Sequence, residues 1–117
     1  MSFPVRSISF LFVALFSASA PFADDDPVFV IKFADGSIDP PVVEVPPGRR
    51  FKLELHNNGV GPVEFESTEL RREKVLGAGA SSFITIRRLD PGEYRFFDDF
   101  HPETPPATLI AREPANQ

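Results

Sequence analysis

Short stretches in which apolar and polar residues alternate recur along most of the chain and indicate β-strands. Residues 51–57 alternate most regularly and place Phe51, Leu53 and Leu55 on one face. Residues 63–66 alternate in the same way. The other expected strands are residues 28–33, 40–45, 82–87, 93–97 and 108–112. Because successive side chains of a strand point to opposite faces, these segments predict sheets that bury one face.

Turn signals separate the expected strands. The chain contains 13 prolines and 7 glycines, and Asp35-Gly36, Pro46-Pro47-Gly48 and Asp90-Pro91-Gly92 are typical of turns. Residues 57–62 predict a loop, and residues 67–73 are the stretch in which a helical turn is expected. About seven short strands at this spacing predict an all-β Greek-key sandwich with one short helical turn.

The N-terminal segment follows a different pattern. Residues 8–16 form an apolar run that is too short to span a bilayer as a stable helix, and Arg6 before them is the only charged residue up to position 23. This pattern predicts a signal peptide over residues 1–23, one domain over residues 24–117, and export to a bacterial periplasm. An uncleaved membrane anchor is the alternative.

The cleavage site is expected after Ala20 or after Ala23. The Ala18-x-Ala20 pattern fits the small-x-small rule, but Pro21 would follow that cut directly. Cleavage after Ala23, just before a run of three aspartates, is therefore the preferred prediction.

The composition removes several classes of function. The chain has no cysteine, and its one methionine is Met1, inside the predicted leader. Disulfides, cysteine nucleophiles, iron–sulfur clusters and thiolate or thioether metal sites are therefore excluded. Lys and Arg number 12 against 17 Asp and Glu, which gives a net charge of −5. This acidic balance argues against nucleic-acid binding, which usually needs a basic face.

The end of the expected strand at residues 93–97 carries the first candidate metal site. Asp98, Asp99 and His101 follow this strand, and the Asp98-x-x-His101 spacing lets both side chains turn toward one point. One oxygen donor and one nitrogen donor on a short loop suit a metal ion. The alternative is a solvated loop whose histidine caps a turn.

A second group of acidic residues begins on the strand at residues 63–66. Glu64 and Glu66 point to the same face, where they are either exposed or neutralised by a cation. Glu73 follows beyond the expected helical turn and could fold back beside them. His56, the other histidine, lies on the polar face of its strand and is expected at the surface.

Three arginine pairs punctuate the chain: Arg49-Arg50, Arg71-Arg72 and Arg87-Arg88. Neighbouring residues of a strand point to opposite faces, so the pairs predict no single basic patch. Surface charge balance is the preferred interpretation, and docking to an acidic partner is the alternative.

Several separated motifs together resemble one known family. They are Asn57-Asn58-Gly59, Glu64-Phe65-Glu66-Ser67, Leu70-x-x-Glu73-Lys74 and Pro91-Gly92-x-Tyr94-x-Phe96-Phe97-Asp98-x-Phe100-His101. In this order and spacing they resemble the cupredoxin-like family, in particular its EfeO-type branch of periplasmic proteins associated with bacterial iron permeases. The resemblance covers nearly all of residues 28–112.

The resemblance implies a cupredoxin-like fold without a blue-copper centre. Blue-copper cupredoxins take one histidine from the strand after an Asn-Gly loop, and a Cys-x-x-His pair and an axial methionine from a later loop. By the resemblance, Glu64 takes the first histidine place, and Asp98 and His101 take the cysteine and second histidine places. Pro106 falls near the methionine place and has no donor atom to offer. One of the four ligands is retained, so a type 1 copper site is not expected.

The replacement of sulfur donors by carboxylates has a chemical direction. Carboxylates suit iron, manganese or oxidised copper, and an acidic oxygen-rich site binds Fe³⁺ more tightly than Fe²⁺. The resemblance therefore implies a periplasmic iron-uptake protein that binds iron, copper or both. It would bind Fe²⁺, and in one version oxidise it, for delivery to a membrane iron permease alongside other periplasmic iron-uptake proteins. The expected metal ligands are Glu64, Glu66, Asp98 and His101, with Asp99 and Glu73 as additional ligands.

Two alternatives stay open at this point. The first is a non-enzymatic copper carrier in which Asp98 and His101 hold Cu²⁺ together with His56 or Glu64. The second is an interaction module that has lost its metal site.

Overall fold

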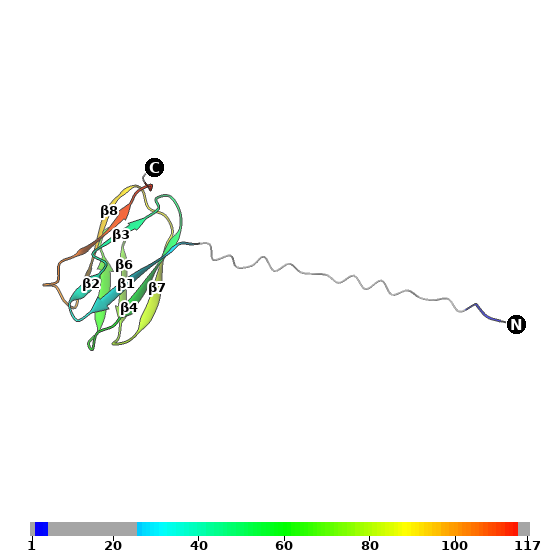
Figure 1. Cartoon of the computed structure of the whole chain (residues 1–117), viewed down its shortest axis with the longest axis horizontal. Coiled ribbons are helices and arrows are strands. Elements are labelled where there is room, and N and C mark those ends of the chain that lie inside the picture. The colour runs from blue at the N-terminus through cyan, green and yellow to red at the C-terminus, as the bar shows by residue number, and fades with distance from the viewer. Residues whose placement is uncertain (1, 5–25, 115–117) are drawn as a thin grey trace.

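The computed structural model describes residues 2–4 and 26–114, and the part from Asp26 onward folds as two facing sheets (Figure 1). The described residues form nine strands and no helix. These strands are β1 (Val28–Ala34), β2 (Ser37–Asp39), β3 (Val42–Val45), β4 (Phe51–Asn57), β5 (Val63–Ser67), β6 (Arg72–Leu76), β7 (Ser81–Ile86), β8 (Gly92–Asp98) and β9 (Ala107–Ala111). The all-β prediction is therefore confirmed.

The predicted signal peptide, residues 1–23, lies outside the described residues except for positions 2–4, and both expected cleavage sites lie outside them altogether. Within the described residues, no helix is long and apolar enough to cross a membrane. The leader, its cleavage and the export that it implies stay predictions.

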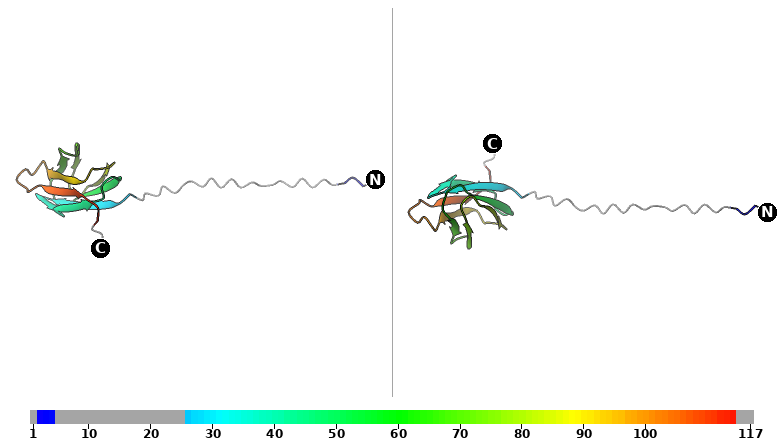
Figure 2. Two further views of the ribbon diagram at one scale, coloured as in Figure 1. Left: turned by 90° about the horizontal axis from the view of Figure 1, so that it is seen from above. Right: turned by 90° about the horizontal axis from the view of Figure 1, so that it is seen from below.

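Each sheet mixes parallel and antiparallel strand pairs. The first sheet has the order β2-β1-β4-β7, with β1 and β4 parallel. The second has the order β3-β9-β8-β5-β6, with β3 and β9 parallel. Figure 2 shows the two layers from opposite sides. Strands β7 and β6 are edge strands of the two different sheets, and they lie next to each other along one border of the sandwich.

The core lies between the two sheets and consists of alternate residues of each strand. Phe51, Leu53 and Leu55 of β4 are fully buried, as their alternation predicts. Phe65 of β5 stacks on Phe96 of β8 with the ring centroids 5.2 Å apart. Each of these buried side chains contributes on the order of 2–3 kcal/mol by leaving water.

The sequence pattern did not indicate two of the strands, β2 and β6. Strand β2 has three residues, too few to show an alternation. Strand β6 is exposed over most of its length, because it is an edge strand that lacks a covered face. The helical turn expected at residues 67–73 is wrong. The N–H of Arg71 donates to the carbonyl oxygen of Thr68 at 3.2 Å, which closes a tight turn, and β6 begins at the next residue.

The side chain of Asn57 fixes the loop that leads into β5. Asn57 is buried, and its Nδ2 donates to the carbonyl oxygens of Gly61, Leu76 and Gly77 at 2.8, 3.1 and 3.1 Å. Its Oδ1 accepts the N–H of Gly59 at 3.0 Å. The start of β5 is thereby tied to the end of β6, and this sets the position of the acidic residues on both strands.

Candidate metal centre

Strand β5 presents two chemically different faces. Val63 and Phe65 point into the core and are fully buried, whereas Glu64 and Glu66 point outward and are half-buried. On the neighbouring edge strand, Glu73 lies directly opposite Glu66 and shares the outer face. The prediction that Glu64 and Glu66 share a face is confirmed, and Glu73 reaches them through the β5–β6 hairpin.

Asp99 joins these residues from the end of β8. Its N–H donates to the carbonyl oxygen of Glu64 at 3.0 Å, which holds the chain alongside β5. One carboxylate oxygen each from Glu64, Glu66 and Asp99 lies within 4.8 Å of the other two. Within the described part of the chain, these three residues are the group of potential ligands close enough to share one metal ion. We call Glu64, Glu66, Asp99 and the nearby Glu73 the acidic cluster.

The negative charges of the acidic cluster act on one another. Partial burial and then the charge of Asp99 raise the pKa of Glu64, and Glu66 and Glu73 add smaller effects of the same sign. Partial burial and then Asp99 also raise the pKa of Glu66. The surroundings of Glu64 and Glu66 thus disfavour their ionised forms, and a bound cation would offset this effect.

Asp98 points away from the acidic cluster. It lies opposite Phe65 in the β5–β8 pairing and is buried with it. Its Oδ1 accepts the N–H groups of Glu64 and Phe100 at 3.0 and 3.1 Å, and its Oδ2 accepts the Nδ1–H of His101 at 2.6 Å. The carboxylate of Asp98 therefore fastens the loop after β8 to β5.

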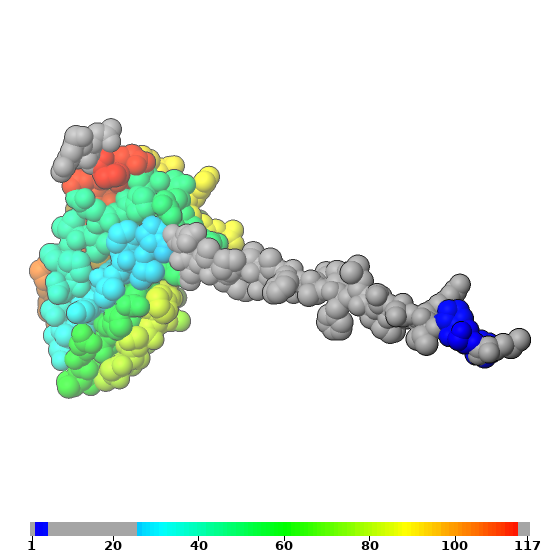
Figure 3. Space-filling view, turned by 45° about the vertical axis from the view of Figure 1, so that its right-hand side comes forward, coloured from blue at the N-terminus to red at the C-terminus, as the bar shows by residue number. Residues whose placement is uncertain are grey.

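The two histidines lie in separate places, and neither touches the acidic cluster. His101 is paired with Asp98 through Nδ1, which leaves Nε2 as the ring nitrogen with a lone pair. His56 lies on the outer face of the first sheet, whose strands β1 in blue-cyan and β7 in yellow-green are visible in Figure 3. Its Nε2 is 2.8 Å from Glu54 Oε2 and its Nδ1 is 2.7 Å from Ser81 Oγ, so both ring nitrogens have partners.

The six predicted ligands thus form two groups on opposite faces of the second sheet. The acidic cluster is on the outer face, and the pair of Asp98 and His101 is on the inner side. Asp99, which the sequence suggested only as an additional ligand, takes a central place. The alternation along β8 could have predicted this role of Asp99. Phe96 and Asp98 share the buried face, so the next residue is expected to point outward.

Neither group fits a type 1 copper centre. The chain has no cysteine, and its one methionine is Met1. The side chain opposite Asp98 on β5 is the apolar Phe65, and the carboxylate of Asp98 already accepts three N–H groups. The acidic cluster offers oxygen atoms only, which suit hard cations.

Comparison with known proteins points to one family. A family model described as a cupredoxin-like domain matches residues 7–111. An uncharacterised protein of Rickettsia prowazekii (strain Madrid E) is 31% identical over 105 residues, which cover 88% of this chain and 84% of that protein.

Solved structures share the fold at low sequence identity. Reduced auracyanin from Roseiflexus castenholzii has a TM-score of 0.62 at 15% identity, over 75% of this chain and 98% of that one. The purple cupredoxin from Nitrosopumilus maritimus has a TM-score of 0.54 at 16% identity, over 71% and 98%. The metal-binding domain of the Cu(I)-exporting ATPase CopA of Streptococcus pneumoniae D39, solved with Cu(I), has a TM-score of 0.64 at 14% identity, over 74% and 85%.

Proposed function

The chain belongs to the cupredoxin-like domain family, and from this premise we propose that it binds a hard metal cation at the acidic cluster. The fold is related to copper-binding proteins. The observation that carries the proposal is the approach of three carboxylate oxygens, from Glu64, Glu66 and Asp99, to within 4.8 Å of one another. The raised pKa of Glu64 and of Glu66 supports it, because burial and then the charge of Asp99 disfavour the ionised carboxylates, and a bound cation would offset both effects.

We propose iron as the cation that the cluster carries. An oxygen-only, acidic donor set attracts Fe³⁺ more strongly than Fe²⁺, because the additional charge increases the Coulomb energy. Such a site lowers the reduction potential of bound iron and favours loss of one electron from Fe²⁺ to an outside acceptor such as dioxygen. The described residues supply the ligands for this step, and the acceptor comes from solution.

The proposal extends to location and partner. The leader pattern of residues 1–23 supports export to the periplasm, and the resemblance to EfeO-type proteins supports delivery of iron to a membrane permease. Fractionation of cells that express the chain tests the first part: a shortened protein released with the periplasmic contents is expected. An unshortened protein in the membrane fraction would contradict it.

The binding experiment compares matched variants. The metal-free protein is titrated by calorimetry with Fe²⁺ without oxygen and with Cu²⁺ in air, and oxygen is then admitted to the iron sample while ferric absorbance is followed. We expect Asp99→Asn and Glu66→Gln to weaken iron binding about tenfold or more, because each removes a charged ligand. His101→Gln is the control that should keep iron binding, since His101 lies outside the acidic cluster.

Three outcomes would overturn parts of this proposal. Equal iron affinity in the wild type and Asp99→Asn would remove the acidic cluster as the site. Bound Fe²⁺ that oxidises no faster than free Fe²⁺ would remove the oxidation step. Binding of Cu²⁺ alone, lost in His101→Gln and kept in Asp99→Asn, would favour the copper-carrier alternative at the Asp98–His101 pair.

A further inference from the structure

Three arginines that are far apart in the sequence line one groove. They are Arg50, Arg72 and Arg87, one from each arginine pair, and Thr85 is the fourth residue of the lining. Arg50 precedes β4, Arg72 opens β6 and Arg87 follows β7. The expectation that the pairs form no common patch is wrong for these three members, because the edges β6 and β7 lie next to each other.

Backbone and side-chain contacts hold two of these arginines in place. Arg72 Nη1 donates to the carbonyl oxygen of Thr85 at 2.9 Å and so links the edges of the two sheets. Arg50 Nε donates to Asp26 Oδ2 at 2.7 Å, and the side chain of Arg50 remains 61% exposed. Among the described residues, the ion pair between Arg50 and Asp26 is the one that involves any of these three arginines. The groove therefore keeps an excess of positive charge in a chain whose net charge is −5.

The chemistry of the lining selects a particular kind of ligand. Guanidinium groups stay charged at every physiological pH, and their planar N–H forks match the oxygens of carboxylates and phosphates. The groove has a volume of about 680 Å³, within the size range of small-molecule sites, and its walls are polar. We propose that the groove of Arg50, Arg72 and Arg87 binds a small soluble polyanion with two or more carboxylate or phosphate groups.

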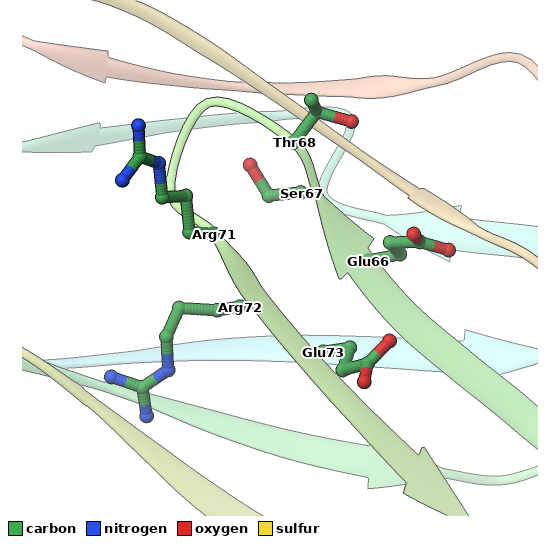
Figure 4. A pocket seen from close by; sticks show the side chains of 6 residues that line it. All are labelled: Glu66, Ser67, Thr68, Arg71, Arg72 and Glu73. Carbon is green, nitrogen blue, oxygen red and sulfur yellow. The ribbon is translucent and has the colours of Figure 1, made fainter.

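The anion groove and the acidic cluster use different side chains of β6. Arg72 and Glu73 are consecutive residues of β6, so their side chains leave the strand on opposite faces. Figure 4 shows a smaller pocket at the β5–β6 hairpin, in which Arg71 and Arg72 extend to one side of β6 and Glu66 and Glu73 lie on the other. An anion in the groove and a cation at the acidic cluster can therefore bind without sharing a ligand.

The test uses pyrophosphate and citrate as probes in metal-free buffer, with binding followed by calorimetry at low ionic strength. We expect both probes to bind and to lose affinity as salt is added. Arg50→Gln and Arg87→Gln are each expected to weaken binding about fivefold to tenfold, because each removes one charge-assisted contact. Arg71→Gln is the matched control, since it removes the same charge from a residue outside the groove. Glu66→Gln should not weaken anion binding, because it removes a nearby negative charge and no ligand of the anion, and this separates the groove from the metal site.

Each contrary outcome has a definite meaning. No binding of either probe by the wild type would overturn the proposal. An equal loss in Arg71→Gln would show that the overall charge, and not the groove, attracts the anion. Binding only to vesicles that contain phosphatidylglycerol, with none to the soluble probes, would replace the small ligand by a membrane surface.

Discussion

At the scale of the residue, two adjacent aspartates take opposite parts because strand parity separates them. Asp98 is the last residue of β8 and turns its carboxylate inward, where it accepts N–H groups from Glu64, Phe100 and His101. Asp99 leaves the strand outward and joins the acidic cluster. One residue type therefore supports the fold at one position and offers a metal ligand at the next.

The corresponding prediction compares Asp98→Ala with Asp99→Ala. Asp98→Ala removes the acceptor of three part-buried N–H groups and is expected to lower the free energy of unfolding by about 2–4 kcal/mol. Asp99→Ala removes an exposed, repelled charge and should change it by less than about 0.5 kcal/mol. Urea unfolding at pH 7 measures both, and equal losses in the two variants would contradict the assignment.

Asn57 gives a second test at this scale. Its side chain donates to three carbonyl oxygens that join two loops. Asn57→Ala is expected to lower the free energy of unfolding by about 2–3 kcal/mol, because the buried carbonyl of Leu76 and the part-buried carbonyls of Gly61 and Gly77 lose this donor. Asn58→Ala, one residue farther along an exposed loop, is the control and should be close to neutral in the same unfolding experiment.

At the scale of the element, the features that the sequence did not predict involve the edge strand β6. The alternating strands and their core residues were predictable, because alternation on β4, β5 and β8 is a local signal. Strand β6 carries charged residues on both faces, so its pattern resembles a loop, although hydrogen bonds to β5 define it. The groove of Arg50, Arg72 and Arg87 was not predictable, since it depends on how two edges meet across the sandwich.

The position of Glu66 on this hairpin, partly buried and next to Asp99, predicts an unusual pH dependence. The pKa of Glu66 is raised in the folded state above its ordinary value of 4.5. A group with a raised folded-state pKa favours folding most when it is protonated, so its contribution is lost as the pH rises from about 4.5 through the folded pKa. Glu66→Gln removes this loss and is expected to raise Tm at pH 7 in metal-free buffer.

The difference in Tm between Glu66→Gln and the wild type should shrink as the pH falls toward 4.5, because the Glu66 carboxyl of the wild type then becomes protonated and loses its charge. Thermal unfolding at several pH values measures the difference between the two proteins. A difference that stayed constant with pH would show that Glu66 acts through packing and not through its charge.

At the scale of the whole molecule, the sandwich places a negatively charged cluster and a positively charged groove near one border. The acidic cluster lies on the outer face of β5 and β6, and the arginine groove lies where β6 meets β7. The residues of both charged sites lie outside the hydrophobic core. The core between the two sheets therefore stabilises the domain without involving either site.

A cation that binds only the folded molecule must stabilise it as a whole. Mn²⁺ is a suitable probe because it is hard and does not change oxidation state readily. At a free concentration about 100 times Kd, it is expected to add about 2.7 kcal/mol to the free energy of unfolding. Thermal unfolding with and without Mn²⁺ measures this effect, and Asp99→Asn should lose most of it. An equal rise in that variant would place the cation elsewhere.

Glu64 connects the acidic cluster on the outer face of the sheet to the Asp98–His101 pair on its inner side. Its side chain belongs to the acidic cluster on the outside, while its backbone N–H is held by the carboxylate of Asp98, which also holds the imidazole of His101. A cation bound by the Glu64 carboxylate is expected to shift the Glu64 backbone slightly. That shift would change the hydrogen bond between the Glu64 N–H and Asp98. The ¹⁵N resonances of the His101 ring are therefore expected to shift when a metal ion binds the acidic cluster. A histidine that does not contact the metal would then report metal binding by NMR.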